Sequence, residues 1–368
     1  MPARHLGLIA NDAKAGAREL VEALIRDFGE HPVQLHFDHR VGRLIGAKNC
    51  LTERELADVC ELLIVLGGDG TILDVLHALG EKLPPLFGIN LGTLGFLTTV
   101  GANERARAVH AVVAGDYVLS ERTLLKVEIL RGGDVIESRI VLNDAVASRG
   151  EVSRLVRLTV RIGDTVLTEY NADGLIVATP TGSTAYSLSA GGPIIEPHSG
   201  VFVVNPICPH VLTNRAVIVN HDTPITITPA DSSPDVFLTL DGRTSHRIES
   251  GDTIRISRAP QRLPLAMLPG VSFFDVLRQK LKWSCAAVWG TSAPGALHSR
   301  HVYPRLRHEP PDHGRLPNSA VALVAARCRL PRGARLCRRR QSIQDRCRCG
   351  RGTSSRGSGR ERIHRPEH

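Results

Sequence analysis

The 368-residue chain has no long apolar stretch, and its apolar runs fall short of the roughly 20 consecutive residues that a membrane-spanning helix needs. Its N-terminus, Met1 to His5, precedes a short apolar run that ends at Asn11-Asp12. That run is too short for the core of a signal peptide, and no cleavage site follows it. These absences predict a cytoplasmic protein with no membrane partner.

Cysteine is scarce before the C-terminal segment. Cys50, Cys60 and Cys208 lie far apart and lack the spacing of metal ligands, so no metal site can be assigned to protein side chains. Scattered cysteines favour a reducing compartment over a disulfide scaffold. Cys347 and Cys349 have no second, well-spaced pair with which to form a metal site.

Excess positive charge is absent from most of the chain, although the total is +9. From Trp283 onward the sequence has 18 Arg, no Lys and 5 acidic residues, which leaves a net charge of −4 for the residues before it. Residues 284–368 also lack helical or strand periodicity, which is typical of a segment that cannot bury a core. We interpret this tail as a disordered extension or a misread reading frame. The alternative is a basic arm that binds nucleic acid, which the rest of the chain does not favour.

Short apolar strands alternate with helical patterns over residues 1–116. This alternation predicts an α/β domain with a parallel sheet and helices on both sides. The expected strands are Leu6–Ala10, Val33–Phe37, Leu62–Leu66 and Leu86–Ile89, and the expected helices are Ala15–Phe28, 53–60 after the capping pair Thr52 and Glu55, Ile72–Leu79 and Glu104–Ala114.

Residues 117–272 carry short apolar runs separated by turn pairs, mostly without helices between them. The spacing predicts a second, largely antiparallel all-β domain. An amphipathic pattern over Phe273–Trp283 predicts a closing helix that completes the first domain. The expected strands are Leu124–Leu130, Val135–Leu142, Leu155–Ile162, Val166–Tyr170, Val201–Asn205, Ala216–Val219, Ile225–Thr228, Val236–Leu240 and Thr253–Ser257.

A phosphate-binding loop is predicted at Gly67-Gly68-Asp69-Gly70-Thr71, between a buried strand and a helix. Its glycines let backbone N–H groups approach an anion, and the helix adds its positive N-terminal dipole. A carboxylate is unfavourable in such a loop unless it accepts a proton or holds Mg²⁺ against phosphates. An ordinary β-turn remains the alternative. The loop has neither the Gly-Lys-Ser/Thr of a P-loop nor the spacing of a dinucleotide fingerprint.

Three more polar clusters follow. Asn90–Phe96 contains two glycines after a strand, so it should line the same crevice as the first loop, although a packing turn would explain it equally well. Asn143-Asp144 suits ribose hydroxyls or an adenine edge, or else forms a turn. Asp173-Gly174 precedes a strand and the hydroxyl-rich segment 179–187, where Ser183 or Thr184 could cap a helix. We interpret the surplus hydroxyls as the lining of a sugar and phosphate pocket.

With these clusters in this order, the chain closely resembles the NAD kinase family from about Leu6 to Trp283. Asn205–His210 and Phe273–Leu277 add to the resemblance. It implies transfer of the γ-phosphate of ATP to the 2′-hydroxyl of the adenosine ribose of NAD. It also implies a divalent ion such as Mg²⁺, and a homodimer or homotetramer whose subunits share the NAD site.

By the same resemblance, Asp69 accepts the proton of the attacking hydroxyl, and the phosphate loop comprises Gly67, Gly68, Gly70 and Thr71. Asn171 and Arg243 differ from residues common at those positions, and both should border the nucleotide. The implied NAD contacts are Asp69, Gly70, Asn143, Asp144, Arg154, Asn171, Asp173, Thr181, Thr184, Ala185, Tyr186, Ser187, Leu188, Ser189 and Arg243.

Two alternative functions use the same residues differently. A diacylglycerol or sphingoid kinase shares the Gly-Gly-Asp-Gly-Thr loop, but it would need an apolar acceptor pocket in place of the hydroxyl-rich segment. A non-enzymatic binder would act through the Arg-rich tail.

Overall fold

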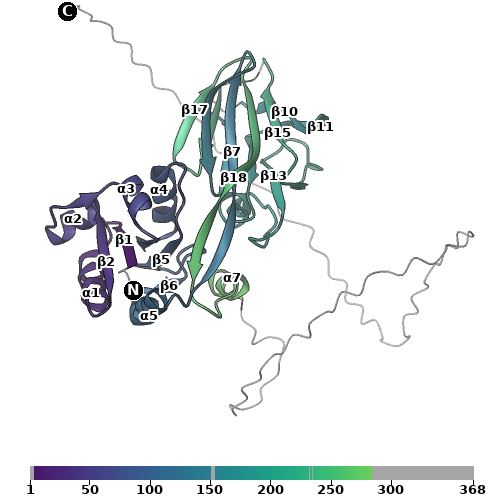
Figure 1. The fold of residues 1–368 in the computed structure, drawn as a ribbon. Helices are drawn as coiled ribbons and strands as arrows, with labels where there is room; N and C mark the ends of the chain where they lie inside the picture. The colour runs from purple at the N-terminus through teal and green to yellow at the C-terminus, as the bar shows by residue number, and fades with distance from the viewer. Residues whose placement is uncertain (1–3, 151–153, 232, 234, 284–368) are drawn as a thin grey trace, which may run out of the picture. The chain divides into compact units, whose positions relative to one another are not determined.

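The computed structural model describes residues 4–150, 154–231, 233 and 235–283. These residues belong to one compact unit (Figure 1). The predicted phosphate loop and all the predicted NAD contacts lie among them, whereas the tail from 284 to 368 lies outside the described residues.

The predicted parallel sheet is confirmed. It comprises β1 (Arg4–Ala10), β2 (Val33–Asp38), β3 (Cys50–Leu51), β4 (Leu62–Gly67) and β5 (Leu86–Asn90), in the order β5-β4-β1-β2-β3. From β1 the chain proceeds outward to β2 and β3, and it then returns to β4 on the other side of β1. Ligands of open α/β sheets bind beyond the carboxyl ends of the strands at such a reversal. The end of β4 is therefore the expected place for a site.

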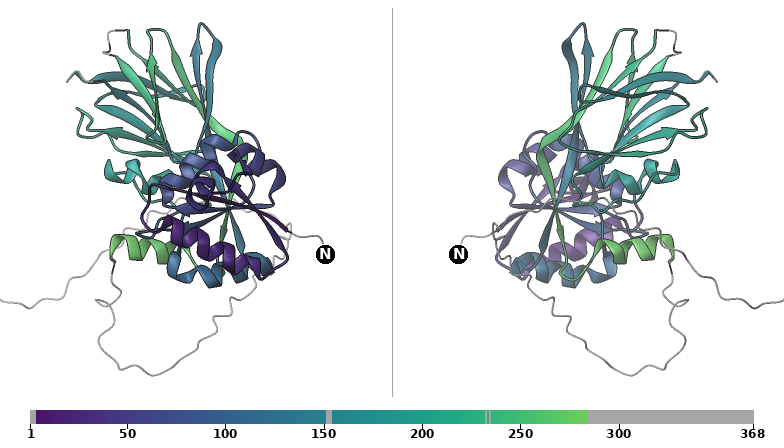
Figure 2. Two further views of the ribbon diagram at one scale, coloured as in Figure 1. Left: turned by 90° about the vertical axis from the view of Figure 1, so that its left-hand side faces the viewer. Right: turned by 90° about the vertical axis from the view of Figure 1, so that its right-hand side faces the viewer.

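Helices cover both faces of this sheet, as predicted (Figure 2). Successive side chains of a strand point to opposite faces. Leu62 and Ile64 accordingly pack with α1 (Ala17–Gly29), α2 (His39–Ile45) and α5 (Arg105–Ala114). Leu63 and Val65 pack with α3 (Glu53–Val59) and α4 (Asp69–Leu79). Strands buried on both faces explain the continuous apolar runs of the sequence.

Helix caps explain one success and one failure of the sequence prediction. Thr52 and Glu55 form the predicted capping box at the start of α3. Helix α2 was not predicted, although Asp38 caps it by accepting a hydrogen bond from the Val41 N–H at 2.7 Å. An Asp that precedes a short amphipathic segment was the available signal.

The β-rich part is confirmed as largely antiparallel and consists of two packed layers. Their facing side chains form one apolar core. One layer contains β9 (Asp144–Arg149), β12 (Gly174–Ala178), β13 (Val201–Ile207), β14 (Val217–Asn220), β16 (Val236–Leu240) and β17 (Thr244–Ile248). The other contains β7 (Val118–Arg131), β8 (Asp134–Val141), β10 (Val156–Ile162), β11 (Thr165–Ala172), β15 (Ile225–Pro229) and β18 (Thr253–Met267).

Strands β7 and β18 are much longer than predicted and join the two parts (Figure 1). They pair with each other, and Leu265 of β18 also pairs in parallel with Leu86 of β5. The parallel strands and the second layer therefore belong to one 12-stranded sheet, which also includes the short β6 (Val100–Gly101). After β18 the chain forms α7 (Phe273–Leu281), which Ser272 and Asp275 cap. Among the described residues, no helix is long and apolar enough to span a membrane.

Candidate active site

Asp69 is the first residue of α4, and only Gly68 separates it from the end of β4. The predicted loop is therefore shorter than expected, because its second half is already the first helical turn. The backbone at Gly68 is extended, with φ −113° and ψ −173°. An acidic side chain in this position is stabilised by the helix dipole.

The second loop, which comprises the Asn90–Phe96 segment and the two residues after it, holds the Asp69 carboxylate in place. Asp69 Oδ2 accepts a hydrogen bond from the Phe96 N–H at 2.8 Å. Oδ1 accepts from the Leu97 N–H at 3.0 Å, and from the N–H and hydroxyl of Thr98 at 3.1 and 3.2 Å. Oδ2 thus has a single donor in the described structure, whereas Oδ1 has three. A carboxylate oxygen has two lone pairs, so Oδ2 can accept one more proton donor.

Asn90 fixes the shape of this second loop. Its Nδ2 donates to the Thr98 hydroxyl at 2.8 Å and to the Thr93 carbonyl at 2.7 Å, and its Oδ1 accepts from the Gly92 N–H at 2.6 Å. Because the Thr98 hydroxyl also donates to Asp69 Oδ1, Asn90 helps to fix the position of the Asp69 carboxylate. A segment that the sequence could not distinguish from a packing turn therefore orients the central carboxylate.

Gly95 allows the two loops to approach each other this closely. A Cβ atom on Gly95 would lie 1.9 Å from Asp69 Oδ1 and 2.5 Å from the Thr98 hydroxyl. No real Cβ contact is that short, so only glycine fits beside the undisturbed carboxylate.

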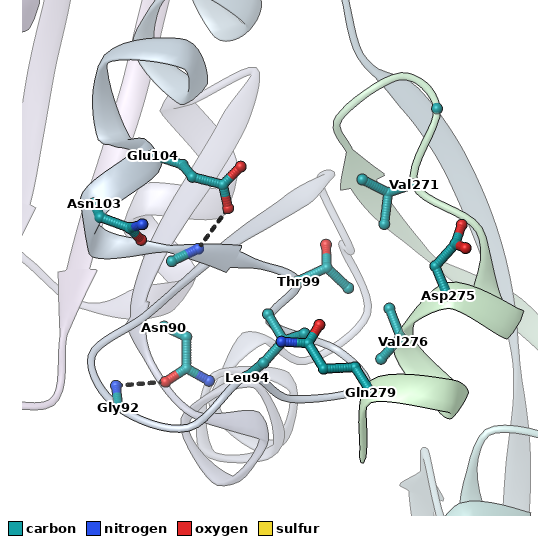
Figure 3. Close-up of a pocket in the computed structure, with 12 residues that line it drawn as sticks. Asn90, Gly92, Leu94, Thr99, Asn103, Glu104, Val271, Asp275, Val276 and Gln279 are labelled. Atoms are coloured by element: carbon teal, nitrogen blue, oxygen red, sulfur yellow. Dashed lines mark hydrogen bonds between the residues drawn. The ribbon is translucent and has the colours of Figure 1, made fainter. Parts of the chain in front are cut away.

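A cavity of about 500 Å³ opens beside the second loop (Figure 3). One wall is made by Asn90, Gly92 and Leu94, and the facing wall by Val276 and Gln279 of α7. Asn103, Glu104 and Asp275 add amide and carboxylate oxygens. This volume lies in the range of small-molecule sites.

Lys14 is a site residue that the sequence analysis missed. It follows β1, whose carboxyl end is adjacent to that of β4 at the reversal of strand order. The exposed Lys14 Nζ lies 3.7 Å from the position that a Cβ on Gly68 would occupy. It therefore adds a positive charge beside the glycines, where an anion would bind. The pattern of strands predicts this proximity, but a single lysine gave no signal.

A second cavity, of about 350 Å³, joins Asn143, Asp144, Ala185 and Tyr186 of the predicted set. Tyr186 is 47% exposed and forms part of its lining. The remaining lining residues are Val146, Ser148, Thr239, Asp241 and Gly242.

Asp241 organises this second cavity, although no motif in the sequence predicts a role for it. Its buried carboxylate accepts hydrogen bonds from the backbone N–H groups of Leu142, Asn143 and Asp144 at 3.0, 2.7 and 3.2 Å. His77 Nε2, from α4, lies 2.8 Å from Asp241 Oδ2. Asp241 thus ties helix α4, which begins at Asp69, to the wall of the second cavity.

Arg243, which follows the lining residue Gly242 of the second cavity, makes a second connection to helix α4. Its guanidinium donates to the Gly70 carbonyl at 2.6 Å and also pairs with Asp74. The predicted residues Gly70 and Arg243 are therefore direct neighbours. In the described structure, Arg243 braces the phosphate loop from the side of the second cavity.

Burial, reinforced by the nearby Asp241 carboxylate, raises the pKa of Asp144 to about 7, although a hydrogen bond from the Tyr186 backbone opposes the shift. The folded chain therefore retains a proton between about pH 4 and pH 7 that an unfolded Asp has lost. The contribution of this proton to the free energy of unfolding is fully present below about pH 4, and it is lost as the pH rises through about 7.

We expect Asp144→Asn to abolish this pH dependence. The free energy of unfolding of the unmodified chain, relative to Asp144→Asn, should fall by up to about 4 kcal/mol between pH 4 and pH 7, because one pKa unit corresponds to about 1.4 kcal/mol. Denaturant titrations at several pH values measure the difference, and the exposed Asp116→Asn controls for loss of a surface carboxylate. A difference that stays constant over this range would contradict the raised pKa.

The hydroxyl-rich segment bonds mainly to its own backbone. The hydroxyls of Thr179, Ser183 and Thr184 donate to the carbonyls of Leu142, Pro180 and Thr181 at 2.5, 2.6 and 3.0 Å. Neither the 3₁₀ turn Gly182–Thr184 nor α6 (Tyr186–Ser189) has a side-chain cap, so the predicted capping role of Ser183 or Thr184 is wrong.

Ser187 is buried, and its hydroxyl accepts from Asn205 Nδ2 at 3.3 Å. Thr181 Oγ1, by contrast, is buried without a hydrogen-bond partner among the described residues. Leu188 is partly buried and Ser189 is exposed. Most of the hydroxyls therefore stabilise the turn, and Thr181 has a hydroxyl that remains available to a ligand.

Arg154, Asn171 and Asp173 are among the predicted contacts that do not line the second cavity. Strands β9 and β12 pair so that Asp144 faces Ala178 and Ser148 faces Gly174. Ser148 lines the cavity, so the cavity extends to the end of β12 at which Asp173 precedes Gly174. The Asp173 carboxylate pairs with Arg149 at 2.7 Å, and Arg154 is exposed.

Comparison with known proteins gives consistent matches. The family model described as the ATP-NAD kinase N-terminal domain matches residues 6–117, and that of the C-terminal domain matches residues 142–268. The chain is 43% identical over 267 residues to an NAD kinase of Geotalea daltonii, across 73% of this chain and 93% of the relative. It is 46% identical over 221 residues to an NAD kinase of Symbiobacterium thermophilum, across 60% and 78%.

Solved structures match as well. A yeast NADH kinase complexed with NADH gives a TM-score of 0.69 at 27% identity, over 81% of this chain and 91% of that protein. An Archaeoglobus fulgidus NAD kinase in complex with ATP gives a TM-score of 0.59 at 24% identity, over 76% and 98%. At that identity the second match supports the fold alone.

Proposed function

This chain belongs to the NAD kinase family and phosphorylates NAD to NADP with ATP as a substrate, and from this premise we propose that Asp69 is its proton acceptor. The observation that carries the proposal is the carboxylate held by the second loop, with Oδ2 open to one further donor. The 2′-oxygen of the adenosine ribose attacks the γ-phosphorus, its proton passes to Asp69, and the bond to the leaving ADP oxygen breaks.

Positioning contributes more to this reaction than basicity. Phosphoryl transfer passes through a loose transition state in which the protein mainly aligns the groups and stabilises charge. The hydrogen bonds from Phe96, Leu97 and Thr98 restrict the carboxylate of Asp69 before substrate arrives. The acceptor therefore needs no rearrangement when the hydroxyl approaches.

We propose that the adenosine end of NAD occupies the 350 Å³ cavity. Asn143 offers a donor and an acceptor, Asp144 an acceptor, and Tyr186 an aromatic surface for a base. Arg243 sits beside Gly70, between this cavity and the phosphate loop. The NAD contacts proposed here are Asp69, Gly70, Asn143, Asp144, Thr181, Thr184, Ala185, Tyr186, Ser187, Leu188, Ser189 and Arg243.

Arg154, Asn171 and Asp173 require a different explanation, since they do not line that cavity, although Asp173 adjoins Gly174, which faces the lining residue Ser148. We propose that they contact the far end of an extended dinucleotide, within a homodimer or homotetramer whose subunits share the site. Free cysteines at positions 50, 60 and 208 support a cytoplasmic location.

The triphosphate is proposed to lie along Gly67, Gly68, Gly70 and Thr71, with the donor nucleoside in the 500 Å³ cavity. We propose that Mg²⁺ arrives on the nucleotide, because Mg²⁺ keeps water and phosphate ligands and rarely needs a protein cage. The ion would neutralise phosphate charge during transfer.

We also propose that the two parts of the chain supply different portions of the site. Residues 1–116, completed by residues 273–283, supply the phosphate loop, and residues 117–272 supply most of the NAD contacts. The Asp241 and Arg243 contacts with α4 support a site built from both parts.

Lys14→Met should raise the KM for ATP about tenfold and change kcat less. Loss of a charge-assisted contact with phosphate costs about 1.5 kcal/mol, which corresponds to about tenfold in affinity. Steady-state kinetics with varied ATP measure the effect. Lys82→Met is the control, because Lys82 is also exposed but pairs with Asp58, away from the loop. Equal KM values for the two variants would show that Lys14 does not contact the bound ATP.

The proposed reaction is tested by incubating the full chain with ATP, Mg²⁺ and NAD. The product should be oxidised coenzyme that an NADP-specific dehydrogenase accepts, with the new phosphate on the 2′-oxygen by ³¹P NMR. Diacylglycerol and a sphingoid base, offered in parallel, should remain unphosphorylated. Phosphate on the 3′-oxygen, or on a lipid instead of NAD, would contradict the proposal.

A further inference from the structure

A third cavity, of about 290 Å³, lies where the N-terminal end of β7, the C-terminal end of β18 and the start of α7 meet. Figure 1 shows α7 beside these ends of the two long strands. The cavity shares no lining residue with the Asp144 cavity, but it adjoins the 500 Å³ cavity, with which it shares Gly270 and Val271. Its lining comprises Val118, Leu119, Ser120, Arg122, Glu196, Pro197, His198, Met267, Leu268, Gly270, Val271, Ser272, Phe273 and Phe274.

Arg122 is the unusual member of this lining. Arg122 is only 4% exposed, and its Nε atom has no hydrogen-bond partner in the described part of the chain. Among the described residues the guanidinium makes no ion pair, and its one side-chain hydrogen bond is from Nη2 to Met267 Sδ at 3.9 Å. Burial lowers the pKa of Arg122 to about 10, although attraction to the Asp69 carboxylate opposes the shift. Asp69 does not contact the guanidinium directly, and buried charges are ordinarily paired by contact, so this position suits an anion that binds beside it.

Other polar groups of the cavity suit an anion of low charge. The Ser120 hydroxyl lies 3.4 Å from His198 Nε2, and when the imidazole donates to the serine oxygen, the serine O–H is free to donate to a ligand oxygen. The N-terminus of α7 also borders the cavity at Ser272 and Phe273. Exposed Glu196 lies on the same lining and would repel a group with several negative charges.

Three large apolar side chains of the lining are open to solvent. Val118 is 57% exposed, Leu119 45% and Phe274 51%, and all three border the cavity. The rings of Phe273 and Phe274 stand edge to face with their centroids 5.4 Å apart. Large exposed apolar side chains grouped around a polar centre are typical of a binding site for an amphipathic ligand.

We propose that this cavity binds a monocarboxylate with a small apolar body. The carboxylate would pair with the Arg122 guanidinium, because the planar fork of arginine matches the two oxygens of a carboxylate. One guanidinium compensates one negative charge, and Glu196 disfavours a second. The apolar body would lie against Phe273, Phe274 and Leu119.

The proposed ligand would affect the Asp69 carboxylate in two ways, through a packing contact and through charge. The Phe273 ring packs against the Phe96 ring at a centroid distance of 6.3 Å, and the Phe96 N–H is the single donor to Asp69 Oδ2 among the described residues. The Arg122 charge also attracts the Asp69 carboxylate, so an anion bound to Arg122 would weaken that attraction. An occupied cavity is therefore coupled to the catalytic group.

Isothermal titration calorimetry of the full chain with benzoate tests the site, with its neutral isostere benzamide and the dianion phenyl phosphate as comparisons. Benzoate should bind with a Kd of about 1 mM or tighter, and the other two at least about tenfold more weakly. Absence of benzoate binding, or equal binding of benzoate and benzamide, would overturn the proposal.

Arg122→Met should abolish benzoate binding and melt at the same or a higher temperature, because it removes an unpaired buried charge. Arg139→Met, which replaces an exposed arginine on β8, is the matched control and should bind normally. Should Arg122→Met fail to fold, Leu119→Glu gives the same test from an exposed position, since its carboxylate would repel the ligand. Undiminished benzoate binding by either variant would refute the assignment of Arg122.

Discussion

Asp69→Asn should lower kcat for NAD phosphorylation at least about 100-fold while it leaves NAD affinity within a few-fold of normal. The amide cannot take the proton of the 2′-hydroxyl. The substitution also replaces one carboxylate oxygen, an acceptor, with an NH₂ group, a donor. At least one of the backbone N–H groups of Phe96, Leu97 and Thr98 must therefore lose its acceptor. Steady-state kinetics and NAD titration measure the two effects separately.

Thermal unfolding provides the necessary control for this variant. Loss of one buried hydrogen bond should cost about 1–3 kcal/mol, which the domain should survive. A folded Asp69→Asn protein with near-normal kcat would show that Asp69 serves only to close the second loop.

Gly95→Ala should lower kcat by about tenfold to 100-fold even though Asp69 remains present and ionisable. The new Cβ would lie 1.9 Å from Asp69 Oδ1, so the carboxylate must move away from the loop. Displacement of a catalytic group by about 1 Å is enough for a loss of this size. Kinetics of the variant, at saturating ATP and NAD, measure the loss.

Gly29→Ala, at the end of α1, is the control for a glycine-to-alanine change away from the site. A Cβ there would meet no heavy atom within 4 Å, and Gly29 is exposed. Its kcat should stay close to normal. If both alanine variants were equally active, the approach of Gly95 to Asp69 would have no catalytic importance.

The parallel part of the fold could be predicted because its determinants are local. Apolar runs such as Leu62–Leu66 are buried on both faces, and Thr52 with Glu55 marks a helix start without reference to distant residues. The glycines at positions 67 and 68 identify the end of β4 by composition alone. Periodicity and capping are properties of neighbouring residues, so a sequence displays them directly.

Long strands that join the two parts could not be predicted in the same way. Strand β18 contains Pro260 and Pro264, and its pairing with β7 shifts register between Arg258 and Arg262. These features resemble a strand end in the sequence. The pairing partner, β7, supplies the continuity, and it lies more than a hundred residues earlier.

In the candidate site, too, local features could be predicted from the sequence and long-range contacts could not. Polar clusters identified Asp69, Asn143 and Asp144, but not how their surroundings hold them. The hydrogen bonds from Phe96, Leu97 and Thr98 to Asp69 come from backbone N–H groups, which every residue except proline carries. Similarly, Asp241 acts through the backbone of residues 142–144 and through His77. Roles that depend on backbone direction or on distant contacts have no signature in composition.

The central claim is that the Asp69 carboxylate faces the hydroxyl that is phosphorylated. A crystal structure of the chain with NAD bound measures this directly. The account predicts that the adenosine 2′-oxygen lies within about 2.6–3.2 Å of Asp69 Oδ2, or one water away from it. A 2′-oxygen that instead bonds to Asp144 or Asp173, and lies beyond the reach of Asp69 even through a water, would contradict it.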